Sequence, residues 1–160
     1  MGRKLSVARR AADMRVFHFG DMREVDRGAI GEYALHIQCP WRIDGPDGII
    51  IGRLDLWEHI SGKAMPDEWE PSTDDNLQDL RLGELLGGYD ARTRSHVNNT
   101  KWLVVERVQA RNVGDVVIAL SGGYRLVIFP AGSKGESWRI FEPDKDLPHF
   151  VVEGDEFYFV

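Results

Sequence analysis

Residues 32–43 read EYALHIQCPWRI, a stretch in which apolar and polar side chains alternate almost without interruption. Successive side chains of a β-strand point to opposite faces, so this alternation predicts one strand with one buried face. Residues 44–48 then predict a turn, and residues 49–51 predict a returning strand. The predicted apolar face consists of Tyr33, Leu35, Ile37, Cys39, Trp41 and Ile43.

The rest of the chain shows the same β pattern on both sides of this hairpin. Residues 54–60 fit a further strand or an irregular extension, and residues 5–12 fit either a short helix or a strand. Short connections require antiparallel pairing, because parallel strands need long crossovers. We therefore predict a mainly β (α+β) fold in one domain, residues 1–160, with a bent antiparallel sheet that forms a sandwich or a partly open barrel. The other predicted strands are 14–19, 102–109, 116–120, 124–129, 137–141, 149–153 and 156–160.

One prominent helix is predicted near residues 75–86, after a long polar connector at residues 61–76. Thr73, Asp74 and Asp75 offer N-caps and favourable charge at the start of this helix. Gly87 and the glycine after it give a C-terminal stop. The predicted apolar anchors of the helix are Leu77, Leu80, Leu85 and Leu86.

Composition and charge limit the class of protein. The chain of 160 residues carries a net charge of −6, contains one cysteine and has no apolar run near the length of a membrane span. A net-negative protein repels phosphates, which argues against general nucleic-acid binding. A single cysteine excludes an internal disulfide and suits a reducing compartment. These features predict a cytoplasmic protein without a membrane segment.

A row of polar side chains on the hairpin strand is the first candidate site. His36 and Gln38 are two residues apart and point the same way on a strand, so both can hold one ligand. Arg42 offers a planar donor fork for a carboxylate or phosphate, which predicts a small anionic ligand. Trp57 lies in an irregular segment and is a candidate for an exposed contact surface. The alternative is that this row is only the solvent face of a half-buried strand.

The sequence contains no motif that is typical of a cofactor or metal site. The five histidines form no H-x-x-H or H-E-x-x-H pair, and the glycine pairs follow no phosphate-binding pattern. Cys39 lies on the apolar face of its strand, where a small buried hydrophobe is expected rather than a nucleophile. We therefore expect neither a cofactor nor a metal ion.

Three short motifs carry a resemblance to other proteins. YALHIQCPWRI at residues 33–43, LSGGY at residues 120–124 and the pair Trp138 and Arg139 resemble a group of small uncharacterised bacterial proteins, mostly actinobacterial. The resemblance runs over most of the chain and implies a stand-alone bacterial cytoplasmic domain, but no substrate. Some small β proteins with a similar C-terminal segment are immunity-type binding partners, and this looser likeness implies a binding role.

Two functions follow as expectations. The first is a non-catalytic binding or interaction module whose partner is a protein rather than a metabolite. The alternative is a small hydrolase-like enzyme in which His36 is the general base, Arg42 binds an anionic substrate, and Asp55 or Glu58 orients the imidazole. Residues 156–160, EFYFV, also predict an apolar edge strand and hence a two-fold homodimer.

Overall fold

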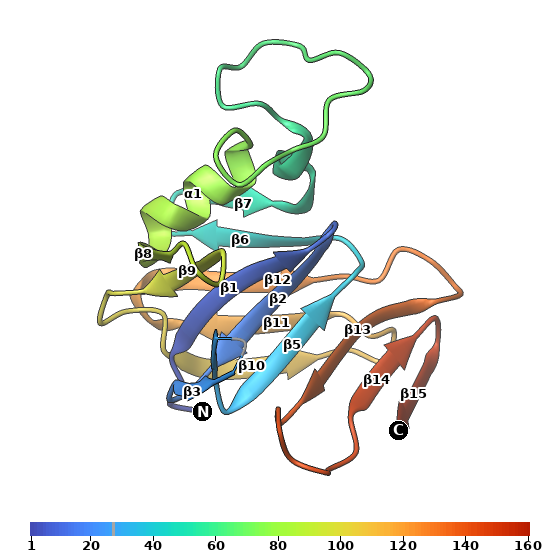
Figure 1. Cartoon of the computed structure of the whole chain (residues 1–160). Helices are drawn as coiled ribbons and strands as arrows, with labels where there is room; N and C mark the ends of the chain where they lie inside the picture. The colour runs from blue at the N-terminus through green and yellow to red at the C-terminus, as the bar shows by residue number, and fades with distance from the viewer. Residues whose placement is uncertain (27) are drawn as a thin grey trace.

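The computed structural model describes residues 1–26 and 28–160, and its largest element is an antiparallel sheet of eight strands (Figure 1). This first sheet mixes strands from the two ends of the sequence, so β5 lies between β2 and β13. In spatial order its strands are β15 (Glu156–Phe159), β14 (Phe150–Glu153), β13 (Glu136–Phe141), β5 (Tyr33–Ile37), β2 (Met14–Phe19), β1 (Leu5–Ala11), β9 (Ser95–Asn98) and β8 (Gly87–Asp90).

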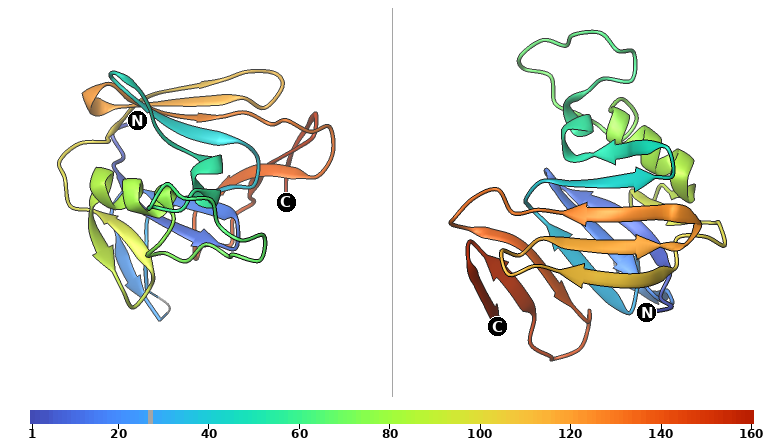
Figure 2. Two further views of the ribbon diagram at one scale, coloured as in Figure 1. Left: turned by 90° about the horizontal axis from the view of Figure 1, so that it is seen from above. Right: turned by 180° about the vertical axis from the view of Figure 1, so that it is seen from behind.

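A second antiparallel sheet faces the first one (Figure 2). Its five strands, in spatial order, are β10 (Val105–Ala110), β11 (Val116–Leu120), β12 (Tyr124–Ile128), β6 (Trp41–Gly45) and β7 (Gly48–Gly52). The remaining elements are the hairpin of β3 (Arg23–Val25) and β4 (Gly28–Ile30), the short 3₁₀ helices η1 (Arg53–Trp57) and η2 (Ser121–Gly123), and the helix α1 (Leu77–Leu86).

The core lies between the two sheets, because each contributes its apolar face to it. Phe17 of β2 and Trp41 of β6 meet edge to face with ring centroids 5.3 Å apart, so aromatic packing joins the sheets directly. The predicted mainly β, antiparallel class with one α-helix is confirmed, and the sheets form a two-layer arrangement that does not close into a barrel. Other core side chains are Leu35, Ile37, Ile43, Ile118, Leu120 and Leu126.

The prediction of one strand over residues 32–43 is wrong. The stretch forms β5 and β6, which belong to different sheets. The chain crosses between the sheets at residues 38–40, where the amides of Gln38 and Cys39 both donate to the carbonyl of Ser137, at 2.9 and 3.1 Å. Pro40 follows and has no amide hydrogen for a ladder. Leu35, Ile37, Trp41 and Ile43 are buried as predicted, whereas Tyr33 is half-buried.

Several boundaries also differ from the expectation. Residues 5–11 form a strand, which settles the choice left open for residues 5–12, and residues 53–57 form η1 rather than a strand. Strand β10 begins only at Val105, and Trp102 before it is exposed. The hairpins β3–β4 and β8–β9 were not predicted, because three- and four-residue strands carry too little alternation to detect.

Helix α1 begins two residues later than predicted and ends where predicted. Asn76 is its N-cap, with Oδ1 accepting from the Asp79 amide at 2.8 Å, and Gly87 ends it in the left-handed conformation with φ 77°. The face of α1 that is buried holds Gln78, Asp79, Leu82 and Leu86. Leu80 was predicted as an anchor but is exposed, because it lies about 100° or more around the helix from that stripe.

Cys39 is buried, as predicted, at the crossing between the sheets. Burial raises the pKa of its thiol to about 11. Since the thiolate is the reactive form, we expect iodoacetamide at pH 8 to modify folded Cys39 about 100-fold more slowly than Cys39 of the urea-unfolded chain. Mass spectrometry over a time course measures both rates. Similar rates with and without urea would show that the thiol is accessible.

Candidate functional site

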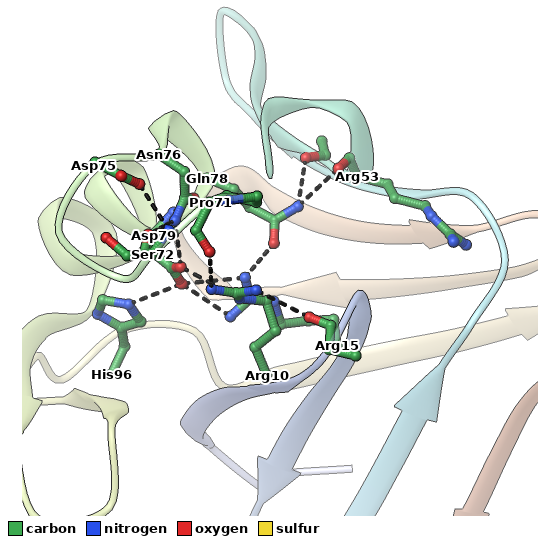
Figure 3. A network of polar contacts seen from close by, with 12 residues as sticks. Arg10, Arg15, Arg53, Pro71, Ser72, Asp75, Asn76, Gln78, Asp79 and His96 are labelled. Atoms are coloured by element: carbon green, nitrogen blue, oxygen red, sulfur yellow. Dashed lines mark hydrogen bonds and ion pairs between the residues drawn. The ribbon is translucent and has the colours of Figure 1, made fainter. Parts of the chain in front are cut away.

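The most enclosed polar cluster in the described chain centres on Arg15 of β2 and Asp79 of α1 (Figure 3). Arg15 is two residues from Phe17, so strand geometry points its side chain into the interior with that ring. Both guanidinium Nη atoms of Arg15 lie 3.2 Å from Asp79 Oδ1, and the two side chains are 1% and 3% exposed. A buried charge requires such a partner.

Three more side chains contact the same carboxylate. Asn76 Nδ2 donates to Asp79 Oδ2 at 2.7 Å, His96 Nε2 of β9 lies 3.2 Å from Oδ1, and Arg10 Nε of β1 lies 3.6 Å from Oδ2. Together these contacts join α1 to three strands of the first sheet. We refer to Arg10, Arg15, Asn76, Gln78, Asp79 and His96 as the polar hub.

Gln78 extends the polar hub toward the second sheet. Its Oε1 accepts from Arg15, and its Nε2 donates to the carbonyls of Gly52 and Arg53 at 2.9 and 3.0 Å. The carbonyls belong to the end of β7 and the start of η1, so one side chain ties both sheets to the helix (Figure 3).

The electrostatics of the polar hub favour a permanently ionised Asp79. Burial alone raises its pKa, but the hydrogen bond from His96 and the charge of Arg15 outweigh burial and hold that pKa at about 2. Burial lowers the pKa of Arg15 to about 10, against the opposing effect of Asp79. Both groups therefore remain charged near neutral pH, and Asp79 serves as an anchor rather than as a proton carrier.

His96 lines a shallow pocket beside α1. Because a carboxylate only accepts hydrogen bonds, Nε2 carries the hydrogen and donates to Asp79. Nδ1 is buried and has no partner among the described residues, and a Cβ added at Gly83 would lie 3.6 Å from it. The pocket of about 420 Å³ is lined by no hydroxyl or thiol except the phenol of Tyr89, so its lining supplies no serine, threonine or cysteine nucleophile.

His36 and Gln38, two predicted binding residues, lie near each other on the outer face of the first sheet. The ring of His36 meets that of Phe141 edge to face at 4.9 Å, and His36 pairs in register with Arg139. Gln38 Nε2 donates to Glu136 Oε1 at 3.3 Å. Burial, reinforced by the charge of Arg139, lowers the pKa of His36, so its imidazole is neutral near pH 7.

The other predicted site residues lie elsewhere. Arg42 is on β6 of the second sheet, where its Nε donates to Asp44 at 2.8 Å. Trp57 is on η1, and its side chain is 55% exposed beside a pocket that Arg10 and Pro71 also line. The four predicted residues therefore occupy three separate places in the fold.

The residues predicted to orient His36 do not meet it among the described contacts. Asp55 accepts from the Gly52 amide at 2.8 Å and pairs with Arg81 of α1 at 3.5 Å. Glu58 is exposed, and its backbone carbonyl accepts from the Leu77 amide at 2.8 Å. The proposed catalytic grouping of His36 with the 55–59 segment thus has no support in the geometry.

A third candidate is the free edge of the first sheet. Strand β15 is the last strand in the sheet order, and it pairs with β14 alone among the described residues. His149 and Val160 exchange both backbone hydrogen bonds, at 2.7 and 3.1 Å. In an antiparallel ladder bonded and non-bonded pairs alternate, so the amide and carbonyl groups of Phe157 and Phe159 point away from β14.

In comparisons with known proteins, no family model, curated protein or solved structure matches the chain. Across residues 1–26 and 28–160, no three His, Cys, Asp or Glu side chains gather in a way that would hold a metal ion. In the same residues no helix is long and apolar enough to cross a membrane.

Proposed function

We propose that the chain is an interaction module that binds a protein partner by adding a strand of that partner to β15. The observation that carries the proposal is the unpaired edge of β15, where Phe157 and Phe159 direct backbone donors and acceptors outward. Such an edge is a template for an extended segment of another chain.

The side chains of this edge support a binding role. Phe157 is 43% and Phe159 is 71% exposed, and their register with Val152 and Phe150 places them on the same face as the core. Aromatic residues, phenylalanine included, are enriched in protein interfaces relative to the rest of the surface. The edge lacks the lysines, prolines and bulges that protect edge strands from pairing.

The proposal is tested with two substitutions at one position. Phe159→Pro removes an outward amide hydrogen and leaves the bonds between β14 and β15 in place, whereas Phe159→Ala removes only the ring. In affinity capture from a bacterial lysate, we expect one stoichiometric partner with the unmodified chain, at least ten-fold less with Phe159→Ala, and none with Phe159→Pro.

Hydrogen exchange locates the interface independently of capture. The amides of Phe157 and Phe159 are expected to exchange rapidly in the free chain and to be protected in the complex. A complex that Phe159→Pro leaves intact, or one that protects only other strands, would contradict strand addition.

A further inference from the structure

The inner face of β13, β14 and β15 is only partly covered by the second sheet. Viewed from behind, these three strands lie to the side of the five-stranded sheet (Figure 2). Phe150 and Phe159 pack edge to face there, with ring centroids 5.3 Å apart. This uncovered part of the sheet continues directly from the edge that β15 presents.

Two neighbouring pockets lie along this inner face, and we refer to them together as the groove. Their lining is mostly apolar, with Arg3 in the first and Glu142 in the second. The first has a volume of about 330 Å³ and extends to Val108 and Ile118 of the second sheet. The second has a volume of about 390 Å³ and extends to Leu147 and Phe159. Tyr33 and Ile140 line both pockets, so the groove runs between the two sheets toward β15. Its size suits bulky apolar side chains.

The segment around β15 is strongly acidic. Residues 142–160 contain six acidic residues and one lysine, a net charge of −5 out of the −6 carried by the whole chain. Glu142 pairs with Lys145 and Asp144 with Arg23. Asp155, in the turn before β15, and Glu156, the first residue of β15, are exposed and form no ion pair with the described residues. A partner with basic residues therefore meets a complementary field here.

The same charge opposes a second copy of this chain on the same edge. Two chains paired through β15 would bring two segments of −5 charge together, and like charges across an interface are destabilising. The homodimer predicted from residues 156–160 is therefore less favoured by this surface than a basic partner is.

Resting on the proposed strand addition, we infer that the partner segment is an extended chain whose bulky apolar side chains enter the groove and whose flanking lysine or arginine residues face the acidic segment at residues 142–160. The free backbone groups of β15 align the partner segment alongside this strand. The groove favours bulky apolar side chains on that segment, and the acidic residues favour basic residues that flank it.

Synthetic peptides provide the test. KKLTFTLKK has alternating apolar residues between lysines, and EELTFTLEE is its charge-reversed counterpart. By isothermal titration calorimetry at 50 mM salt, we expect the lysine peptide to bind at least ten-fold more tightly, with the difference reduced at 500 mM salt because screening weakens exposed charges. Equal affinity of the two peptides, or no binding of either, overturns the inference.

Substitutions separate the groove and the charge from the edge itself. Ile140→Trp fills the wall shared by both pockets, and Leu147→Ser changes an exposed wall residue with little effect on folding. Each substitution is expected to lower the affinity for the lysine peptide, and Ile140→Trp by ten-fold or more. Reversing Asp155 and Glu156 to lysine should abolish the preference for the lysine peptide, whereas reversing Asp67 and Glu68 in the distant connector should not (Figure 1).

The outcomes distinguish this inference from the proposed function. If neither peptide binds but Phe159→Pro still abolishes capture of a partner, the partner chemistry is wrong and strand addition stands. If the lysine peptide binds and the groove substitutions weaken its binding, but Phe159→Pro leaves that binding unchanged, then the groove is the binding site and strand addition is wrong. A dimer by light scattering that Phe159→Pro dissociates would show that a second copy occupies the edge.

Discussion

Replacing Asp79 by alanine is expected to lower the free energy of unfolding by about 3–5 kcal/mol, since this substitution leaves the buried Arg15 guanidinium without its partner. The carboxylate is 3% exposed and receives contacts from Arg10, Arg15, Asn76 and His96, so its loss also leaves buried donors unpaired. Urea unfolding followed by circular dichroism measures the change.

Two comparisons make the Asp79 experiment specific. Asp74→Ala removes an exposed acid shortly before α1 and should change stability by about 0.5 kcal/mol or less. The double variant Arg15→Met with Asp79→Leu replaces the charged pair by apolar side chains and should recover much of the loss. If Asp79→Ala costs no more than Asp74→Ala, the polar hub contributes little to stability.

Acidification from pH 6.5 to pH 4 is expected to remove about 3 kcal/mol of stability through His18 alone. Burial, with a contribution from the charge of Arg9, lowers the pKa of His18 to about 3. Below its ordinary pKa of about 6.5 the unfolded chain binds a proton that the folded chain does not, so stability falls with pH and continues to fall until about pH 3. His36 is shifted in the same direction.

His18→Asn tests this linkage at the residue itself. In the folded chain His18 Nδ1 accepts from the Gly31 amide at 3.2 Å, and an asparagine oxygen can accept in its place without titrating. We expect urea midpoints of the variant to depend much less on pH between 6.5 and 4. His59→Asn, just before the polar connector, is the matched control and should keep the slope of the unmodified chain. An unchanged slope in His18→Asn would contradict the assignment.

The long-range arrangement of strands was only partly visible in the sequence. Alternation located β11 and β12 to within one residue, because each has an apolar face of three residues, and it located β2, in which four of the six residues are apolar. The same rule failed at residues 38–40, since alternation continues in the letters while the backbone changes sheet. The bend depends on the Ser137 carbonyl, about a hundred residues away, and local patterns carry no information about it.

The polar hub was missed for a related reason. Arg15 sits on the apolar face that Phe17 and Phe19 define, and an arginine in that position is the one signal that a buried partner exists. Asp79 was hidden inside a predicted helix whose anchors were taken to be leucines. His96 belongs to a four-residue strand that was not predicted, so no sequence rule connected it with Asp79.

The candidate binding residues were identified singly but not as a group. His36 and Gln38 share one face as expected from their spacing, because His36 lies in β5 and Gln38 directly follows its last residue. Arg42 was expected beside them only on the assumption of one continuous strand, and its place in the second sheet removes that assumption. The aromatic edge at residues 156–159 was recognised as apolar, but its outward backbone groups depend on pairing with β14.

The strand order of the two sheets has a consequence for how the chain folds. Ile37 of β5 lies opposite Trp138 of β13, and Ile43 of β6 lies opposite Leu126 of β12. Neither sheet is complete until segments separated by 80 residues or more have met. The chain therefore loses conformational entropy on closing these long loops before the stabilising contacts form. We therefore expect slow folding, with the unpaired margin of β5 exposed to other nascent chains until β13 emerges from the ribosome.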